Sequence, residues 1–220
     1  MSGRPKDGYR LADGTKVAGV TTIISRFKNA GGLIYWAWQQ GKDGKDFRET
    51  RDAAADAGTL AHAMVEAHLK GEAPEVVGDS APKEIREKAE TAFLGFLEWA
   101  GTMNLRVVEQ ELSLVSEAHR FGGTLDCCVL TINDRLTIGD WKTSNGLYPD
   151  HLIQVAAYRG LFMENFPDRP LAPGGHIMRF NKETGDFHHH FFQDLTMEWE
   201  QFLLFRQAFD NDKIIAKRAK

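Results

Sequence analysis

The sequence predicts an α/β (α+β) protein in which a mixed β-sheet is flanked by helices and preceded by a helical N-terminal region. Residues 1–101 are mainly helical in pattern, whereas residues 102–193 alternate and are rich in β-branched side chains. One helical segment interrupts the strands, and another, residues 194–220, follows them. This order of elements is typical of helices packed against a mixed sheet. The 220 residues, 42% of them hydrophobic, suffice for one core, so we expect a single domain over 1–220.

The N-terminal part is expected to start with a short hairpin and continue as helices. The hairpin turns at Asp13–Gly14 in the segment YRLADGTKVAGV. Glycine favours helix termination, and we expect Gly58–Thr59 to interrupt a long helical run. The helices expected here are one capped by Thr21–Thr22 and running through Phe27, one ending at Gly41, one over Arg48–Ala57, one from Leu60 closed by Gly71, and one after Pro82 with apolar residues at 85, 89, 93, 96 and 97.

The pattern of the second part of the sequence, residues 102–220, predicts strands, helices and a hairpin. Three strands at 105–115, 121–132 and 135–141 form an antiparallel meander with a tight turn at Asn133–Asp134. The remaining elements are a helix over 151–166 after Pro149–Asp150, a hairpin over 174–192 turning near Thr184–Gly185, and an amphipathic terminal helix from Thr196.

Composition and charge exclude several classes of protein. Cys127 and Cys128 are the only cysteines, and neighbours on a strand point to opposite faces, so a disulfide scaffold and an iron–sulfur cluster are excluded. The net charge of −4 argues against a protein that coats nucleic acid by bulk electrostatics. No apolar run has the roughly 18 residues of a membrane helix, and no signal peptide is evident, so we expect a cytoplasmic protein without membrane contacts.

The residues with the clearest chemical signal are the acids and the lysine of GTLD and GDWKTS. Asp140 and Lys142 are two residues apart on one strand, so they project from the same face. The turn at 133–134 returns the chain so that Asp126 can lie beside Asp140. Two converging carboxylates with a backbone carbonyl suit Mg²⁺ or Mn²⁺, and a nearby ammonium can stabilise an anionic transition state, as phosphodiester hydrolysis requires. By themselves these residues favour a hairpin with surface ion pairs, because such letters are common.

Four motifs in order resemble the PD-(D/E)xK nuclease superfamily. They are Gly58-Thr59-x-x-His62-x-x-x-Glu66, the GTLD of Asp126, the GDWK of Asp140 and Lys142, and Gln154-x-x-x-Tyr158 on the following helix. More narrowly, they are similar to the RecB-like exonuclease group, which includes the mitochondrial genome maintenance exonuclease and phage relatives. The resemblance implies a restriction-endonuclease-like mixed sheet. The proline of the family motif is replaced by Leu125.

The resemblance also implies roles for individual residues. The residues with implied catalytic roles are Lys142, Asp126, Asp140, Gln154 and Tyr158. The metal ligands implied are His62, Glu111, Asp126, Asp140 and Trp141, the last through its backbone carbonyl. Glu66 is either a residue that orients His62 or an exposed helix glutamate.

The function implied is a metal-dependent DNA exonuclease that acts on single strands or duplex ends, with Mg²⁺ or Mn²⁺ and without an iron–sulfur cluster. Such a protein serves replication, recombination or repair, frequently in phages, and can have a replication or recombination protein as partner. Two alternatives remain open: a structure-selective or site-specific endonuclease, and a catalytically silent relative that binds DNA or protein.

Two groups of side chains outside the motifs allow a functional or a structural interpretation. His188, His189 and His190 suggest zinc, but His189 faces opposite to the other two on a strand, which favours a plain hairpin edge. The tryptophans at 36, 38 and 99 are expected in the core or at its rim. Trp36 and Tyr35 have the alternative of stacking on unpaired bases.

Overall fold

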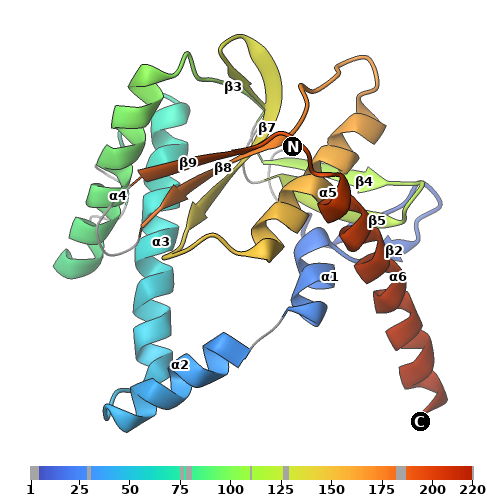
Figure 1. The fold of residues 1–220 in the computed structure, drawn as a ribbon, viewed down its shortest axis with the longest axis horizontal. Helices are drawn as coiled ribbons and strands as arrows, with labels where there is room; N and C mark the ends of the chain where they lie inside the picture. The colour runs from blue at the N-terminus through green and yellow to red at the C-terminus, as the bar shows by residue number, and fades with distance from the viewer. Residues whose placement is uncertain are drawn as a thin grey trace.

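The structure, a computed structural model, contains helices on both sides of a central sheet (Figure 1). It describes residues 5–28, 31–74, 77, 81–109, 111–125, 129–181 and 187–219, without the side chains of Leu33 and of 49–56. The helices are α1 (Val20–Phe27), α2 (Gly31–Lys42), α3 (Phe47–Leu69), α4 (Lys83–Thr102), α5 (Pro149–Asn165) and α6 (Thr196–Arg218). The strands are β1 (Tyr9–Arg10), β2 (Lys16–Val17), β3 (Arg106–Glu109), β4 (Leu112–Ser116), β5 (Phe121–Leu125), β6 (Val129–Ile132), β7 (Arg135–Thr143), β8 (Gly175–Phe180) and β9 (Phe187–Phe192).

The main sheet has five strands in the order β3-β6-β7-β8-β9. All neighbours are antiparallel except β7 and β8, which run parallel because α5 connects them as a crossover. The α/β class and the mixed sheet flanked by helices are therefore confirmed. Two smaller sheets, β1-β2 and β4-β5, lie beside it.

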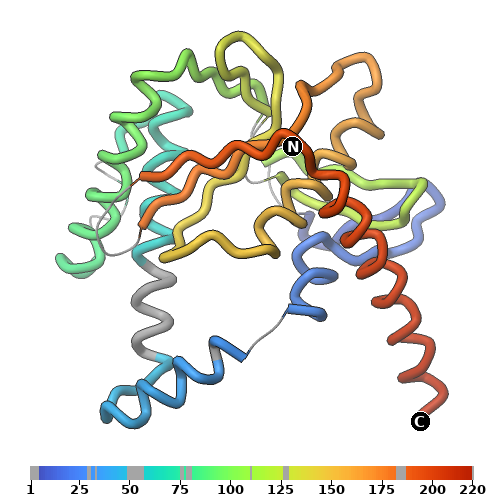
Figure 2. Tube along the Cα trace, in the orientation of Figure 1, coloured from blue at the N-terminus to red at the C-terminus, as the bar shows by residue number. Residues whose placement is uncertain are grey.

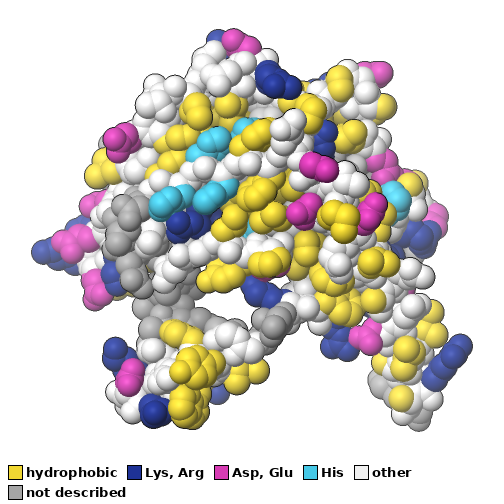
Figure 3. All heavy atoms as spheres, in the orientation of Figure 1, with side chains coloured by type: hydrophobic (Ala, Val, Ile, Leu, Met, Phe, Trp, Pro, Cys, Tyr) yellow, Lys and Arg dark blue, Asp and Glu magenta, His cyan; other side chains and the backbone are white. Residues whose placement is uncertain are grey.

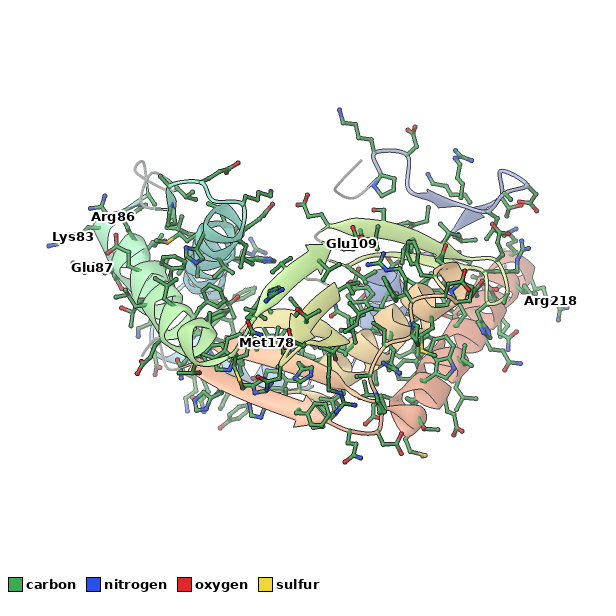
Figure 4. All side chains as sticks on the ribbon, turned by 90° about the horizontal axis from the view of Figure 1, so that it is seen from above. Lys83, Arg86, Glu87, Glu109, Met178 and Arg218 are labelled. Carbon is green, nitrogen blue, oxygen red and sulfur yellow. The ribbon has the colours of Figure 1, made fainter. Side chains whose placement is uncertain are left out.

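Each face of the main sheet packs against its own set of helices. Ile138 and Ile177 point to the face covered by α5, where α1 and α6 complete a cluster with the buried Phe162. Met178 and Phe180 point to the opposite face and pack with α3 and α4 around Phe96 (Figure 4). Alternation along the strands thus separates two apolar layers.

The outer surface of α4 carries ion pairs, and α6 extends away from the sheet (Figure 2). Lys83, Arg86 and Glu87 point away from the sheet, and i,i+4 ion pairs such as Lys83–Glu87 line this surface (Figure 4). Helix α6 projects from the body (Figure 2), and Arg218 near its end lies far from the sheet (Figure 4). Within the described residues, none of the helices combines the length and the apolarity that a bilayer crossing requires.

The N-terminal hairpin is confirmed, but the start of α1 differs from the prediction. Gly14 adopts a φ of +82° in the predicted turn. The cap of α1 is Gly19, whereas the predicted caps Thr21 and Thr22 are exposed residues of the first turn. Val20, only 1% exposed, anchors the first turn in the core, and Gly19 forms a bridge to Gly122, so packing sets the helix start.

The interruption expected at Gly58–Thr59 is absent, since α3 runs unbroken from Phe47 to Leu69. A single helical glycine costs only about 1 kcal/mol relative to alanine. Burial of neighbouring residues such as Ala61 and Val65 against α4 outweighs that cost. The predicted end of the helix is confirmed, because Gly71 has a φ of +74°.

Two of the strands predicted as continuous are each divided. The segment 105–115 becomes β3 and β4, and the segment 121–132 becomes β5 and β6. β3 and β6 pair in the main sheet, whereas β4 and β5 pair in a separate two-stranded sheet. Glu111 has a φ of +48°, a left-handed conformation that ends strand geometry between β3 and β4.

The remaining predicted elements are confirmed where they are described. Asn133 and Asp134 both have positive φ values, as a tight two-residue hairpin turn requires. Pro149 occupies the first turn of α5, and β8 pairs with β9 as a hairpin. The Thr184–Gly185 turn, Asp126 and the two cysteines lie outside the described residues.

Candidate active site

Asp140 and Lys142 lie at the carboxyl-terminal end of β7, on the face covered by α5. Ile138, two residues earlier on this face, is fully buried. The Lys142 ammonium lies 2.5 Å from Oδ2 of Asp140, and the two side chains are 17% and 2% exposed. The predicted shared face is confirmed, and the pair is a shielded one rather than a surface ion pair. Water screens such a pair weakly, so both charges exert strong local fields.

Helix α5 brings Gln154 and Tyr158 to this pair. The Lys142 ammonium donates a hydrogen bond to Oε1 of Gln154 at 3.1 Å. Nε2 of Gln154 donates to the hydroxyl oxygen of Tyr158 at 2.9 Å. Gln154 is 9% and Tyr158 2% exposed. The i,i+4 spacing and the parallel crossover thus connect four predicted residues in one polar chain, Asp140–Lys142–Gln154–Tyr158.

His151 is a residue of this site that no sequence motif predicted. It is 8% exposed, and burial together with the Lys142 charge lowers its pKa to about 4. The charges of Asp150 and Asp140 oppose this shift, which places the imidazole within electrostatic reach of the pair. The sequence signal was its position three residues before Gln154, on the same side of α5.

Two buried polar atoms of the site have no hydrogen-bond partner among the described residues, namely Oδ2 of Asp140 and Nδ1 of His151. The contact of Oδ2 with the Lys142 ammonium is an ion pair that lacks hydrogen-bond geometry. A carboxylate oxygen and a neutral imidazole nitrogen are donors that Mn²⁺ accepts, and the carboxylate also suits Mg²⁺. The residues therefore fit a divalent cation at Asp140, although the described residues contain no group of three acidic, histidine or cysteine side chains with metal-site geometry.

The other predicted metal ligands have different surroundings. Glu66, expected to orient His62 or to be exposed rather than to bind the metal, accepts a hydrogen bond from Lys70, the C-cap residue of α3, and this bond raises the pKa of Lys70. The charge of Glu111 raises that pKa further, so Glu111 lies within reach of Lys70. Glu111 does not follow strand alternation, because its backbone is left-handed. His62 is a half-buried residue of α3. Ligation by His62, Glu111 and Asp126 stays a prediction.

Trp141 faces away from the candidate site. Its side chain is 7% exposed and makes edge contacts with Phe96 and Trp99 on the α4 side of the sheet. Any contribution of Trp141 on the Asp140 side comes from its backbone carbonyl. Trp99 lies in the rim of this core as predicted, whereas Trp38 is 55% exposed beside Tyr35 on α2, which contradicts its core assignment.

The histidines of β9 divide between the two faces as predicted. His189 lies opposite to His188 and His190, and its Nε2 is 2.8 Å from Nδ1 of His176 on β8. Burial, with a smaller contribution from the His189 charge, lowers the pKa of His176 to about 4.

His176 therefore makes stability depend on pH. Between pH 6.5 and 4 the unfolded chain binds a proton at this residue and the folded chain does not, so the free energy of unfolding decreases as pH falls. We expect His176→Asn to flatten this slope by about 1.4 kcal/mol per pH unit, measured by urea unfolding at several pH values. An unchanged slope would show that His176 protonates equally in both states.

Comparisons with known proteins identify no family for this chain. No family model and no curated protein matches it. A solved structure described as "Crystal structure of SSO0001" is similar at 16% identity and a TM-score of 0.35, over 70% of this chain and 72% of its own.

Proposed function

We propose that the protein is a metal-dependent DNA exonuclease of the PD-(D/E)xK superfamily, acting on single strands or duplex ends. The observation that supports this most is the polar chain of Asp140, Lys142, Gln154 and Tyr158. A purely structural hairpin has no need for a buried carboxylate, whose desolvation is costly. The proposed role lies in replication, recombination or repair, with DNA in the cytoplasm of a bacterial or phage-infected cell, and a partner protein from those processes is part of the proposal.

The proposed chemistry is in-line attack of water on a phosphodiester phosphorus: a P–O bond to the water oxygen forms as the P–O bond to the leaving sugar oxygen breaks, the water loses a proton to solvent, and the sugar oxygen gains one to leave as a hydroxyl. Lys142 stabilises the negative charge that develops on the phosphoryl oxygens, and its shielded position strengthens that interaction. Asp140 holds the ammonium and supplies the carboxylate for the cation, with Asp126 as its proposed partner. When bound, a Mg²⁺ or Mn²⁺ ion supplies Lewis acidity and lowers the pKa of the attacking water.

Gln154 positions the lysine in this account. Its amide oxygen accepts from Lys142, and its amide nitrogen is held by Tyr158, so the orientation of the amide is fixed. We expect Gln154→Leu to lower kcat by about 10- to 100-fold with little change in KM, because the ammonium loses its orientation. Tyr158→Phe removes only the distal hydroxyl and should have a smaller effect. The measurement is kcat on labelled DNA. If Gln154→Leu had the same kcat as the wild type, a positioning role for Gln154 would be excluded.

The proposal is tested with end-labelled single-stranded DNA, end-labelled duplex DNA and covalently closed circular DNA, each with Mg²⁺, Mn²⁺ or EDTA. An exonuclease shortens the linear substrates with either metal, leaves them intact in EDTA and does not cut the circle. Cutting of the circle would support the endonuclease alternative. Binding without cleavage under every condition would support the catalytically silent alternative.

A further inference from the structure

A row of basic side chains continues from Lys142 across the sheet. Lys142 of β7 lies beside Arg179 of β8 in the parallel register, and Arg179 lies beside His188 of β9 in the antiparallel register. One row earlier, Asp140 lies beside Ile177, which lies beside His190. Since partners in register share a face, Arg179, His188 and His190 are on the candidate-site face of the sheet.

Arg179 is buried without a carboxylate partner among the described residues. The residue is 8% exposed, Nη1 donates to the carbonyl of Ser144 at 2.9 Å, and Nε has no hydrogen-bond partner. A guanidinium has five donors in a planar fork, and one of these, Nε of Arg179, is buried and unused among the described residues. A buried cation without an anion is unfavourable, so the guanidinium and its free Nε donor suit an anionic ligand.

The two histidines border the guanidinium. His190 lies diagonal to Arg179 on this face, one row away in the β8–β9 register, and burial and the Arg179 charge lower its pKa. Nε2 of His190 is also buried without a partner among the described residues. The His188 and His190 rings stack with centroids 6.2 Å apart, and His188 is exposed. Figure 3 shows histidines gathered over β9 with a cationic side chain beside them.

We propose that Arg179, His188 and His190 form a phosphate-binding subsite for the DNA backbone, next to the phosphate that Lys142 acts on. This inference rests on the proposed nuclease function and extends it. The planar fork of arginine matches two phosphate oxygens, and imidazole N–H groups donate to further oxygens. The subsite lies one to two strands from Lys142, about 5–10 Å at the usual strand spacing. It positions a neighbouring phosphate and takes no part in bond cleavage.

The test compares Arg179→Gln with the matched control Arg135→Gln, an exposed arginine at the opposite end of β7. The first measurement is binding of a fluorescent single-stranded oligonucleotide in EDTA at several salt concentrations. We expect Arg179→Gln to bind about tenfold more weakly. The negative slope of log K against log salt should become less steep by about 0.7 for each phosphate that the variant no longer neutralises. Arg135→Gln should match the wild type in both.

The second measurement uses oligonucleotides in which one phosphate at a time is a neutral methylphosphonate. Wild-type binding should weaken most at one position, and Arg179→Gln should lose that sensitivity at the same position. His188→Gln, at the exposed end of the row, should show a smaller loss at that position. Circular dichroism shows whether Arg179→Gln folds. If it does not, the His188→Gln variant still tests the inference.

The outcomes separate the inference from the function on which it rests. Suppose that the wild-type protein cleaves DNA and that Arg179→Gln has unchanged affinity, salt slope and methylphosphonate profile. That result would overturn the proposed phosphate subsite and leave the nuclease proposal standing. If Arg179→Gln does not fold, an unchanged His188→Gln profile has the same consequence. Wild-type protein that neither binds nor cleaves DNA would overturn both.

Discussion

Replacing Lys142 with methionine is expected to reduce DNA cleavage by about 10³-fold, because the phosphoryl oxygens lose the cation that stabilises their developing charge. Methionine keeps most of the side-chain volume, and α5 still packs on β7 through apolar residues such as Ile153 and Val155. Binding of DNA in EDTA should persist, since other basic groups remain. The measurement is the initial rate of release of labelled nucleotides from single-stranded DNA.

A matched control for this variant is Lys88→Met on α4, where the lysine pairs with Glu84 at the surface. It should retain the wild-type rate. Cleavage by Lys142→Met at the parent rate would show that the ammonium has no part in the chemistry. Loss of binding together with cleavage would instead make Lys142 a substrate-binding residue.

The second large effect is expected for Asp140→Asn, which should also lose cleavage by about 10³-fold because the carboxylate for the cation is gone.

The Lys142→Met and Asp140→Asn variants should differ in stability. Lys142→Met leaves a carboxylate that is 2% exposed without its cation, so the metal-free protein should lose about 3 kcal/mol of unfolding free energy. Asp140→Asn leaves an ammonium that is 17% exposed and still bonded to Gln154, so its loss should be smaller.

Addition of Mn²⁺ should distinguish the variants again. A cation that binds Asp140 raises the unfolding free energy of Lys142→Met by mass action and has little effect on Asp140→Asn. Urea unfolding with and without Mn²⁺ measures both. If the two variants were equally stable and Mn²⁺ changed neither, two claims would be contradicted. The unpaired Asp140 carboxylate would not be the group that destabilises Lys142→Met, and it would not be a cation ligand.

Much of the fold was predictable because local patterns agreed with packing. The period-2 alternation of β7 correctly placed Asp140 and Lys142 on one face, and the helical spacing of Gln154 and Tyr158 placed both on one side of α5. The divided strands were not predictable in this way. The left-handed backbone of Glu111 depends on how the chain passes between two sheets, and no local pattern encodes that path.

The same limit applies to the residues of the site that were missed. His151 and Arg179 are single residues without a motif. The significance of His151 comes from its burial near the Lys142 charge, and that of Arg179 from its burial and from the parallel β7–β8 register that sets it beside Lys142. Gly58 shows the converse, because its low helix propensity predicted a break that packing of α3 on α4 prevents.

The most direct test of the account is a calorimetric titration of the protein with Mn²⁺, comparing the wild type with Asp140→Asn and with Asp134→Asn, a control in the exposed turn before β7. We predict that the wild type and Asp134→Asn bind Mn²⁺ saturably and that the Mn²⁺ affinity of Asp140→Asn is about tenfold or more weaker. Equal Mn²⁺ affinity in all three proteins would contradict the claim that the carboxylate beside Lys142 holds the catalytic cation.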